Sequence, residues 1–287
     1  MLRKGTFILM KTKIQDMTSG SPGRLIILFA IPLMLGNICQ QLYTMVDTMV
    51  VGQIAGVEAL AALGAVDFLM WVVTGISTGL TQGFSIQLSQ YYGAKDFENL
   101  RKSLAHSYRL TAFIAVGVFI LSQSFAALVL TGLHTPSNII GMSLLYLRII
   151  FCGIPATAAY NMFAAALRAM GNSKTPLTAM IIASVLNVSL DILFVAGFGW
   201  GVAGAAIATV IAQSFSAVYC FLILRRIDIV HLTRADFMPA SGMNARLMKL
   251  GIPVVFQNVI IGIGGLAVQY VCLLYTSPSP RDRSLSR

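Results

Sequence analysis

The sequence predicts an all-α polytopic membrane protein, and two observations lead to this fold class. Of the 287 residues, 57% are hydrophobic and only 10% are charged, whereas charged residues make up about 25% of an average soluble domain. The apolar residues also form continuous runs, unlike the alternating pattern of a membrane β-barrel. The composition therefore excludes a soluble enzyme, a disordered chain and a disulfide scaffold, and it indicates helices embedded in a lipid bilayer.

Seven apolar runs, separated by short polar breaks, are the candidate helices. Each contains the roughly 20 residues that cross about 30 Å of hydrocarbon, and the longer runs must tilt or project into water. The predicted spans are 24–51, 57–92, 101–131, 137–167, 175–197, 202–224 and 247–271.

Basic residues gather on one side of this predicted topology. Lysines and arginines precede the first span and occupy the second-to-third, fourth-to-fifth and sixth-to-seventh connections, while the loops near 52–56, 132–136 and 198–201 have none. Because basic loops stay in the cytoplasm, we expect a multi-pass protein of the cell inner (plasma) membrane with a cytoplasmic N-terminus. The net charge of +10 is then a consequence of topology, and no nucleic-acid partner is expected.

The composition also divides the chain into segments. The predicted segments are a basic cytoplasmic N-terminal segment (1–23), a six-helix N-terminal lobe (24–224), a cytoplasmic linker between lobes (225–246), the first helix of a C-terminal lobe (247–271) and a tail (272–287). Met17 is an alternative start to Met1. Within the tail, Cys272 to Asp282 resembles translated transposase-type adapter sequence, so we interpret the tail as non-native; a natural serine- and proline-rich tail is the alternative.

An internal repeat indicates a second lobe. Pro32 precedes Asn37 at the same spacing at which Pro253 precedes Asn258, and an isoleucine stands before each proline. Because transporters are often built from two repeated halves, we expect the natural protein to continue past residue 271 into a C-terminal lobe that is missing from this chain. Coincidence is the alternative, since proline is frequent in membrane helices.

Acidic residues inside spans are costly, so each one suggests a partner, a cavity or a function. In the first predicted span, Asp47 ends a polar row that begins at Asn37 and includes Gln40 and Thr44. The spacing places the row on one helical face, and Pro32 is expected to kink the helix below it. A wet cavity wall fits this row; hydrogen bonding between helices is the alternative.

A second polar row lies on the fifth predicted span. Asn187 and Asp191 are one turn apart there, and Thr209 stands on the sixth span. Counted from the outer loops, Asp47, Asp191 and Thr209 lie at similar depths of roughly 7–11 Å. Carboxylate, amide and hydroxyl oxygens converging at one depth suit a hard cation such as Na⁺, or a carboxyl group that carries a proton.

The remaining titratable residues give weaker indications of a functional role. We expect Arg148 to neutralise Asp67, with a substrate role for Asp67 as the alternative. His106 and His134 near span ends, and His231 in the linker, are expected to be solvated or interfacial. The four cysteines form no paired motif, so neither a disulfide nor a zinc site is expected.

Several motifs over about residues 18–271 resemble those of multidrug and toxic compound extrusion (MATE) transporters, most closely the DinF-type branch. They are Ile31-Pro32-Leu33, Gln40-Gln41-Leu42-Tyr43, Val46-Asp47-Thr48, Tyr146-Leu147-Arg148, Gly153-Ile154-Pro155, Leu167 through Pro176, Asn187 through Asp191 and Gly201 through Ala206. The resemblance implies a twelve-helix secondary antiporter of two six-helix lobes. Such proteins export cationic or amphipathic small molecules in exchange for Na⁺ or H⁺, without another cofactor.

The resemblance also assigns residues. Those that match the family's N-lobe cation or proton site are Asp47, Asn187, Asp191 and Thr209; those that match its cavity-lining positions are Gln40, Tyr146 and Asn161; and Pro32 matches a position at which the helix bends. No metal beyond Na⁺ at the cation site is expected.

Other functions fit the sequence less well. A lipid-linked oligosaccharide flippase of the same superfamily is the alternative, although such a protein tends to place cations in its cavity, and here Arg148 is the one deep cation against three deep acids. An enzyme is not expected, because the spans contain no clustered nucleophile, metal triad or histidine-rich motif. A non-transporting receptor or scaffold is a further alternative.

Overall fold

The computed structural model describes residues 21–238 and 242–276, and every regular element within these ranges is a helix. In chain order the elements are α1 (Pro22–Ile54), α2 (Val57–Gly93), α3 (Phe97–Gly132), α4 (Ile140–Cys152), α5 (Ile154–Ala169), α6 (Lys174–Asp191), the π-helix η1 (Ile192–Gly197), α7 (Gly201–Leu224), the 3-10 helices η2 (Asp228–Val230) and η3 (Arg234–Phe237), and α8 (Met243–Thr276). Six of the described helices are long and apolar enough to cross a membrane, and the bent pair of α4 and α5 makes a seventh span. The predicted all-helical polytopic fold is confirmed.

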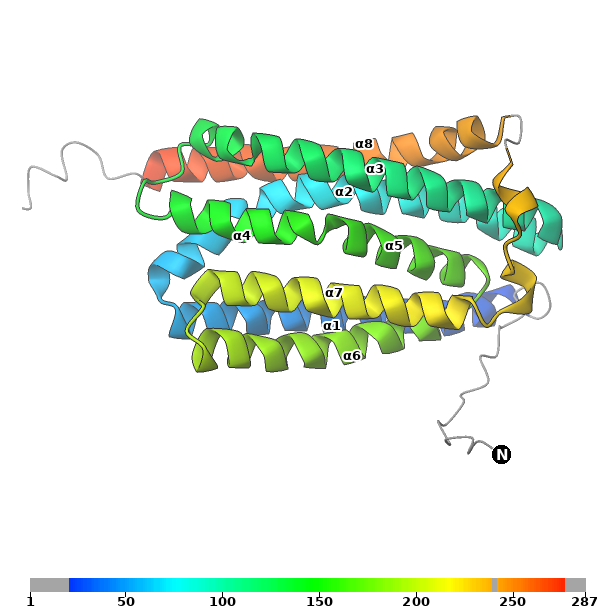
Figure 1. The fold of residues 1–287 in the computed structure, drawn as a ribbon, viewed down its shortest axis with the longest axis horizontal. Helices are drawn as coiled ribbons and strands as arrows, with labels where there is room; N and C mark the ends of the chain where they lie inside the picture. The colour runs from blue at the N-terminus through cyan, green and yellow to red at the C-terminus, as the bar shows by residue number, and fades with distance from the viewer. Residues whose placement is uncertain (1–20, 239–241, 277–287) are drawn as a thin grey trace, which may run out of the picture.

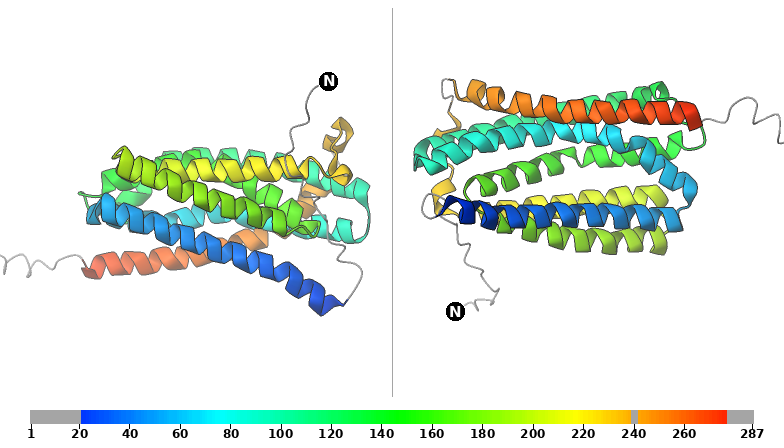
Figure 2. Two further views of the ribbon diagram at one scale, coloured as in Figure 1. Left: turned by 90° about the horizontal axis from the view of Figure 1, so that it is seen from below. Right: turned by 180° about the vertical axis from the view of Figure 1, so that it is seen from behind.

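The helices form an elongated bundle whose long axis all the spans follow (Figure 1). Helices α2, α3 and α8 lie along one side, α1, α6 and α7 along the other, and α4 and α5 run between them, as the rear view in Figure 2 also shows. We call the end where α7 stops and α8 begins the linker end. One buried apolar cluster, around Phe84 and Leu167, fills that end, and a second, around Val66 and Leu147, fills the opposite end.

Helix α8 packs closely along α2 (Figure 1). A Cβ atom added at Gly79 would lie 2.7 Å from the Cα atom of Val255, and one added at Gly83 would overlap the backbone of Gly251. Glycines on α2 therefore let the two backbones approach more closely than side chains would allow, which is a common way for membrane helices to associate.

The predicted span 137–167 is broken in the structure. Helices α4 and α5 meet at Gly153 with a bend of 47°. Pro155, in the first turn of α5, lacks the N–H group that would continue the hydrogen-bond ladder back into α4. By contrast, α1 continues as one helix through Pro32, so that proline does not interrupt it.

Helix α3 has a defined start at the linker end. Asp96 accepts hydrogen bonds from the backbone N–H of Asn99 at 3.1 Å and from its side-chain amide at 2.7 Å. These bonds favour the charged carboxylate and lower the pKa of Asp96. From Phe97 the helix continues for 36 residues, or roughly 54 Å at 1.5 Å per residue, so it extends beyond the hydrocarbon.

The ends of the chain are only partly described. The proposed tail 272–287 begins within α8, which ends at Thr276, and its residues 277–287 lie outside the described part, as do residues 1–20 of the N-terminal segment.

Candidate cation-binding site

Three of the predicted ion ligands are buried on neighbouring helices. Asp47 on α1 is 6% exposed, and on α6 Asn187 is 1% and Asp191 0% exposed. Helix α6 packs against both α1 and α7. The side-chain amide of Asn187 donates to the hydroxyl of Thr209 on α7 at 3.4 Å. All four predicted residues therefore belong to one three-helix packing region.

Several buried side-chain oxygens in this region lack a hydrogen-bond partner among the described residues. Oδ1 of Asp47, Oδ1 of Asn187 and both carboxylate oxygens of Asp191 are buried and accept no hydrogen bond from the described residues. Asp47 and Asp191 lie close enough for their charges to interact, and neither has an ion pair within the described ranges. Two dehydrated like charges repel, so a cation or a proton here would supply the missing partner.

A π-helical turn follows the site directly. The α geometry of α6 ends at Asp191, and η1 takes over at Ile192. The wider turn closes through a hydrogen bond from the N–H of Phe198 to the carbonyl of Leu193, at 2.9 Å. Such turns are rare and occur often at functional sites. The sequence predicted one span over 175–197 and did not predict this π-helical turn.

Two tyrosines adjoin the carboxylates. Tyr146 of α4, 4% exposed, interacts electrostatically with Asp47, Tyr43 and Asp191, and also with Asp67 of α2. Tyr43, one turn before Asp47 on α1, is half-buried and interacts electrostatically with Asp47 and Asp191. Sequence reasoning did not assign Tyr43 to the site, although its spacing from Asp47 was a usable signal.

The other predicted cavity residues lie elsewhere. Asn161 on α5 donates to the hydroxyl of Thr78 on α2 at 3.1 Å, which joins those two helices. Gln40 on α1 is exposed, and its backbone carbonyl accepts from the hydroxyl of Thr44 at 3.0 Å. Of the three predicted cavity residues, the structure places Tyr146 beside the carboxylates.

Two expectations about other titratable residues are wrong. No ion pair joins Asp67 to Arg148 in the described part of the chain, and both side chains are exposed, on α2 and α4. His106 is only 2% exposed rather than solvated, because the linker covers it.

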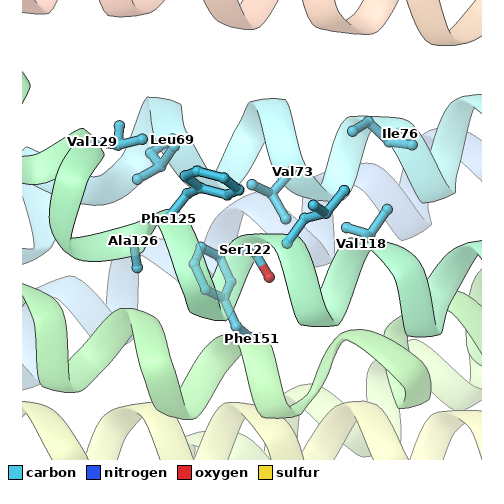
Figure 3. Close-up of a pocket in the computed structure, with 10 residues that line it drawn as sticks. Leu69, Val73, Ile76, Val118, Ser122, Phe125, Ala126, Val129 and Phe151 are labelled. Carbon is cyan, nitrogen blue, oxygen red and sulfur yellow. The ribbon is translucent and has the colours of Figure 1, made fainter.

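The bundle also has an apolar pocket between α2, α3 and α4. Figure 3 shows it lined by aliphatic and aromatic side chains, among them Leu69, Val118 and Phe151, with the hydroxyl of Ser122 as a polar group. It shares no residue with the carboxylate site, and its mostly apolar lining provides few ligands for an ion.

These features define a multi-pass membrane protein with an unpaired pair of buried carboxylates inside its bundle. The MatE family profile matches residues 32–193. The chain belongs to the MatE family, a family of transporters rather than enzymes.

Similar proteins agree with this assignment. The chain is 31% identical over 263 residues to the probable multidrug resistance protein YpnP of Bacillus subtilis, with 92% of this chain and 59% of the relative covered. It is 29% identical over 262 residues to the probable multidrug resistance protein YoeA of the same organism, with 88% and 57% covered. The chain thus spans somewhat more than half the length of the curated relatives that it matches.

A solved structure shows the same fold. The crystal structure of MATE in complex with MaD3S superposes with a TM-score of 0.83 at 25% identity, covering 92% of this chain and 60% of that one. The described helices therefore correspond to about half of a MATE structure.

Proposed function

We propose that this chain is the N-terminal lobe, with the first helix of a C-terminal lobe, of a DinF-type secondary antiporter. The antiporter exports cationic or amphipathic compounds in exchange for Na⁺ or H⁺. Family membership supports multidrug export as the class of activity. The proposal adds the coupling ion, the substrate charge and the residues involved.

The observation that carries the proposal is the set of unpaired oxygens on Asp47, Asn187 and Asp191. Leaving two carboxylates charged, buried and without a partner would cost several kcal/mol. Binding of Na⁺ or H⁺ recovers that energy, so the ion prefers the state in which the site is formed. Thr209 adds a hydroxyl oxygen through its contact with Asn187.

Exchange then follows from competition. An ion that neutralises Asp47 and Asp191 removes the negative charge that attracts a cationic substrate, so the substrate leaves on the outer side. Tyr146, which interacts with both carboxylates, is placed to transmit this change to the cavity. Gln40 and Asn161 are proposed to line the same cavity in the two-lobed protein, and Pro32 to bend α1 during the cycle.

The first test measures binding of ²²Na⁺ to the purified 287-residue chain in lipid nanodiscs, with proton release on Na⁺ addition as a second readout. Asp47→Asn and Asp191→Asn are expected to abolish both signals. Glu58→Gln is the matched control, because Glu58 is an exposed acid in the first turn of α2.

The second test measures Na⁺- or pH-dependent ethidium efflux from cells that express the chain joined to the proposed second lobe. If the two site variants retain ion binding and ion-dependent efflux at the level of the Glu58→Gln control, the proposal is wrong.

A further inference from the structure

The exposed face of α3 indicates where this helix leaves the hydrocarbon of the bilayer. Phe113, Val116, Ile120 and Leu128 lie on this face and are between 51% and 79% exposed, so we interpret it as the lipid-facing side of the helix. The distance from Arg109 to Leu128 is roughly 28 Å at 1.5 Å per residue, close to the about 30 Å of hydrocarbon in a bilayer. Arg109 is therefore placed where the hydrocarbon ends and the lipid headgroups begin.

The linker between α7 and α8 is docked at this level of α3 (Figure 1). Nη1 of Arg109 donates to the carbonyl oxygen of Phe237 at 3.4 Å, and its Nη2 lies 3.4 Å from Nδ1 of His106. The side chains of Phe237 and Met238 nevertheless remain 41% and 69% exposed. Exposed apolar side chains beside a basic residue at headgroup level are typical of segments that are anchored in a membrane interface.

The arginines at this level lack acidic partners. Arg101, two turns nearer the start of α3, lies 3.9 Å from the carboxylate of Asp236, but Arg109 and Arg234 are exposed and have no ion pair within the described ranges. Arg234 stands three residues before Phe237 in η3, and side chains at that spacing in a 3-10 helix lie on the same side. A guanidinium group has five N–H donors in a fork that matches a phosphate, so both arginines can bind one.

We propose that Arg109, Arg234, Phe237 and Met238 form a binding surface for an anionic phospholipid, and we call these four residues the headgroup surface. The two guanidinium groups contact the phosphate and the negative headgroup, while the two apolar side chains insert among the first methylene groups of the acyl chains. A zwitterionic lipid offers the same apolar contact, but its ammonium group opposes the arginines, so the surface prefers an anionic lipid. The inference depends on these contacts and exposures and not on the proposed antiport.

Amide hydrogen exchange of the 287-residue chain in nanodiscs tests the headgroup surface. The amides of Asp236 and Met238 donate to carbonyl oxygens of the linker. They are expected to exchange about fivefold more slowly in discs of mixed phosphatidylglycerol and phosphatidylcholine than in discs of phosphatidylcholine alone, which corresponds to the attraction of one basic side chain for an anionic membrane surface. The amide of Arg225 at the end of α7 is the reference that corrects for the lower surface pH of an anionic disc.

Three variants locate the effect. Arg109→Gln and Arg234→Gln should each remove most of the dependence on phosphatidylglycerol. The Arg234 side chain makes no hydrogen bond or ion pair with the described residues, so its replacement removes a charge without disturbing the docking of the linker. Arg226→Gln is the matched control and should respond like wild type, because Arg226 is an exposed arginine at the same end of the bundle but outside the headgroup surface.

Equal wild-type exchange in the two kinds of disc, or an undiminished lipid response in Arg109→Gln and Arg234→Gln, would overturn the proposal. Equal protection by inorganic phosphate added to phosphatidylcholine discs would also overturn it, because the surface would then bind a soluble anion rather than a lipid. Native mass spectrometry of the chain released from mixed discs is the second readout: wild type and Arg226→Gln should retain phosphatidylglycerol, and the other two variants should lose it. Unchanged exchange in α6 and α7 verifies that the variants are folded.

Discussion

Asp191 occupies a position that folding alone does not favour. Its side chain is 0% exposed, both of its oxygens lack partners within the described residues, and the charge of Asp47 acts on it. A buried acid in this situation lowers stability unless something neutralises it. The proposed binding of an ion or a proton would remove this cost.

Removing that charge should therefore stabilise the chain when no Na⁺ is present. In Na⁺-free buffer at pH 8, Asp191→Asn is expected to raise the free energy of unfolding by about 1–3 kcal/mol, because it relieves the repulsion from Asp47. Thermal unfolding in nanodiscs, with and without Na⁺, provides the measurement. Wild type should gain stability on Na⁺ addition and the variant should not; a destabilised variant that still responds to Na⁺ would contradict this account.

At the residue scale, the sequence allowed part of the site to be predicted. Helical spacing and the cost of intramembrane acids selected Asp47 and Asp191, and the structure buries both in one region. The partnership of Asp67 with Arg148 was predicted wrongly, because opposite charge in two spans does not determine which faces those helices turn to each other. The burial of His106 depends on a linker whose docking has no sequence pattern.

Among the elements, the contact between α2 and α8 is set by glycines. Alanine normally stabilises a helix relative to glycine by about 0.5–1 kcal/mol. At Gly79, however, the new Cβ would lie 2.7 Å from Val255 Cα and 2.8 Å from its N atom, so the two backbones must separate.

Gly79→Ala is accordingly expected to cost about 1–3 kcal/mol of stability, as overpacking usually does. Gly64→Ala is the matched control on the same helix, since an added Cβ there meets nothing within 4 Å, and it should be neutral or slightly stabilising. Midpoints of thermal unfolding in the same nanodiscs compare the two. Equal unfolding midpoints for the two variants would show that α8 does not pack tightly against α2 at Gly79.

The helix positions were predictable because apolar runs long enough to cross a bilayer are typically transmembrane helices. The breaks within these apolar runs were harder to predict from the sequence. Gly153 and Pro155 mark the bend between α4 and α5, but prolines also occur inside unbroken membrane helices, as Pro32 does in α1. The π-helical turn after Asp191 depends on how α6 and α7 pack, and no local motif specifies it.

For the molecule as a whole, orientation in the membrane follows from the basic residues. The linker end carries the lysines and arginines between spans, so we expect it to face the cytoplasm. The exposed apolar faces of α1 and α8, which include Ile26, Met34 and Ile260, are expected to contact lipid or the second lobe.

Cysteine labelling in intact cells checks the orientation. With the native cysteines replaced by serine, His231→Cys at the linker end should resist a membrane-impermeant maleimide, and Ser137→Cys at the opposite end should react. Both positions are exposed, so a difference between them reports sidedness. The reverse pattern would place the N-terminus outside.

The π-helical turn between Asp191 and Gly197 has a consequence for the insertions and deletions that the chain can tolerate. A π turn holds more residues than an α turn, so a single residue can be lost there while the helix relaxes to α geometry and its two ends keep their places. The same loss within α2 would rotate everything beyond it by about 100° and turn Gly79 or Gly83 away from α8. Length variation within α6 and η1 should therefore concentrate at this turn, beside the proposed ion site.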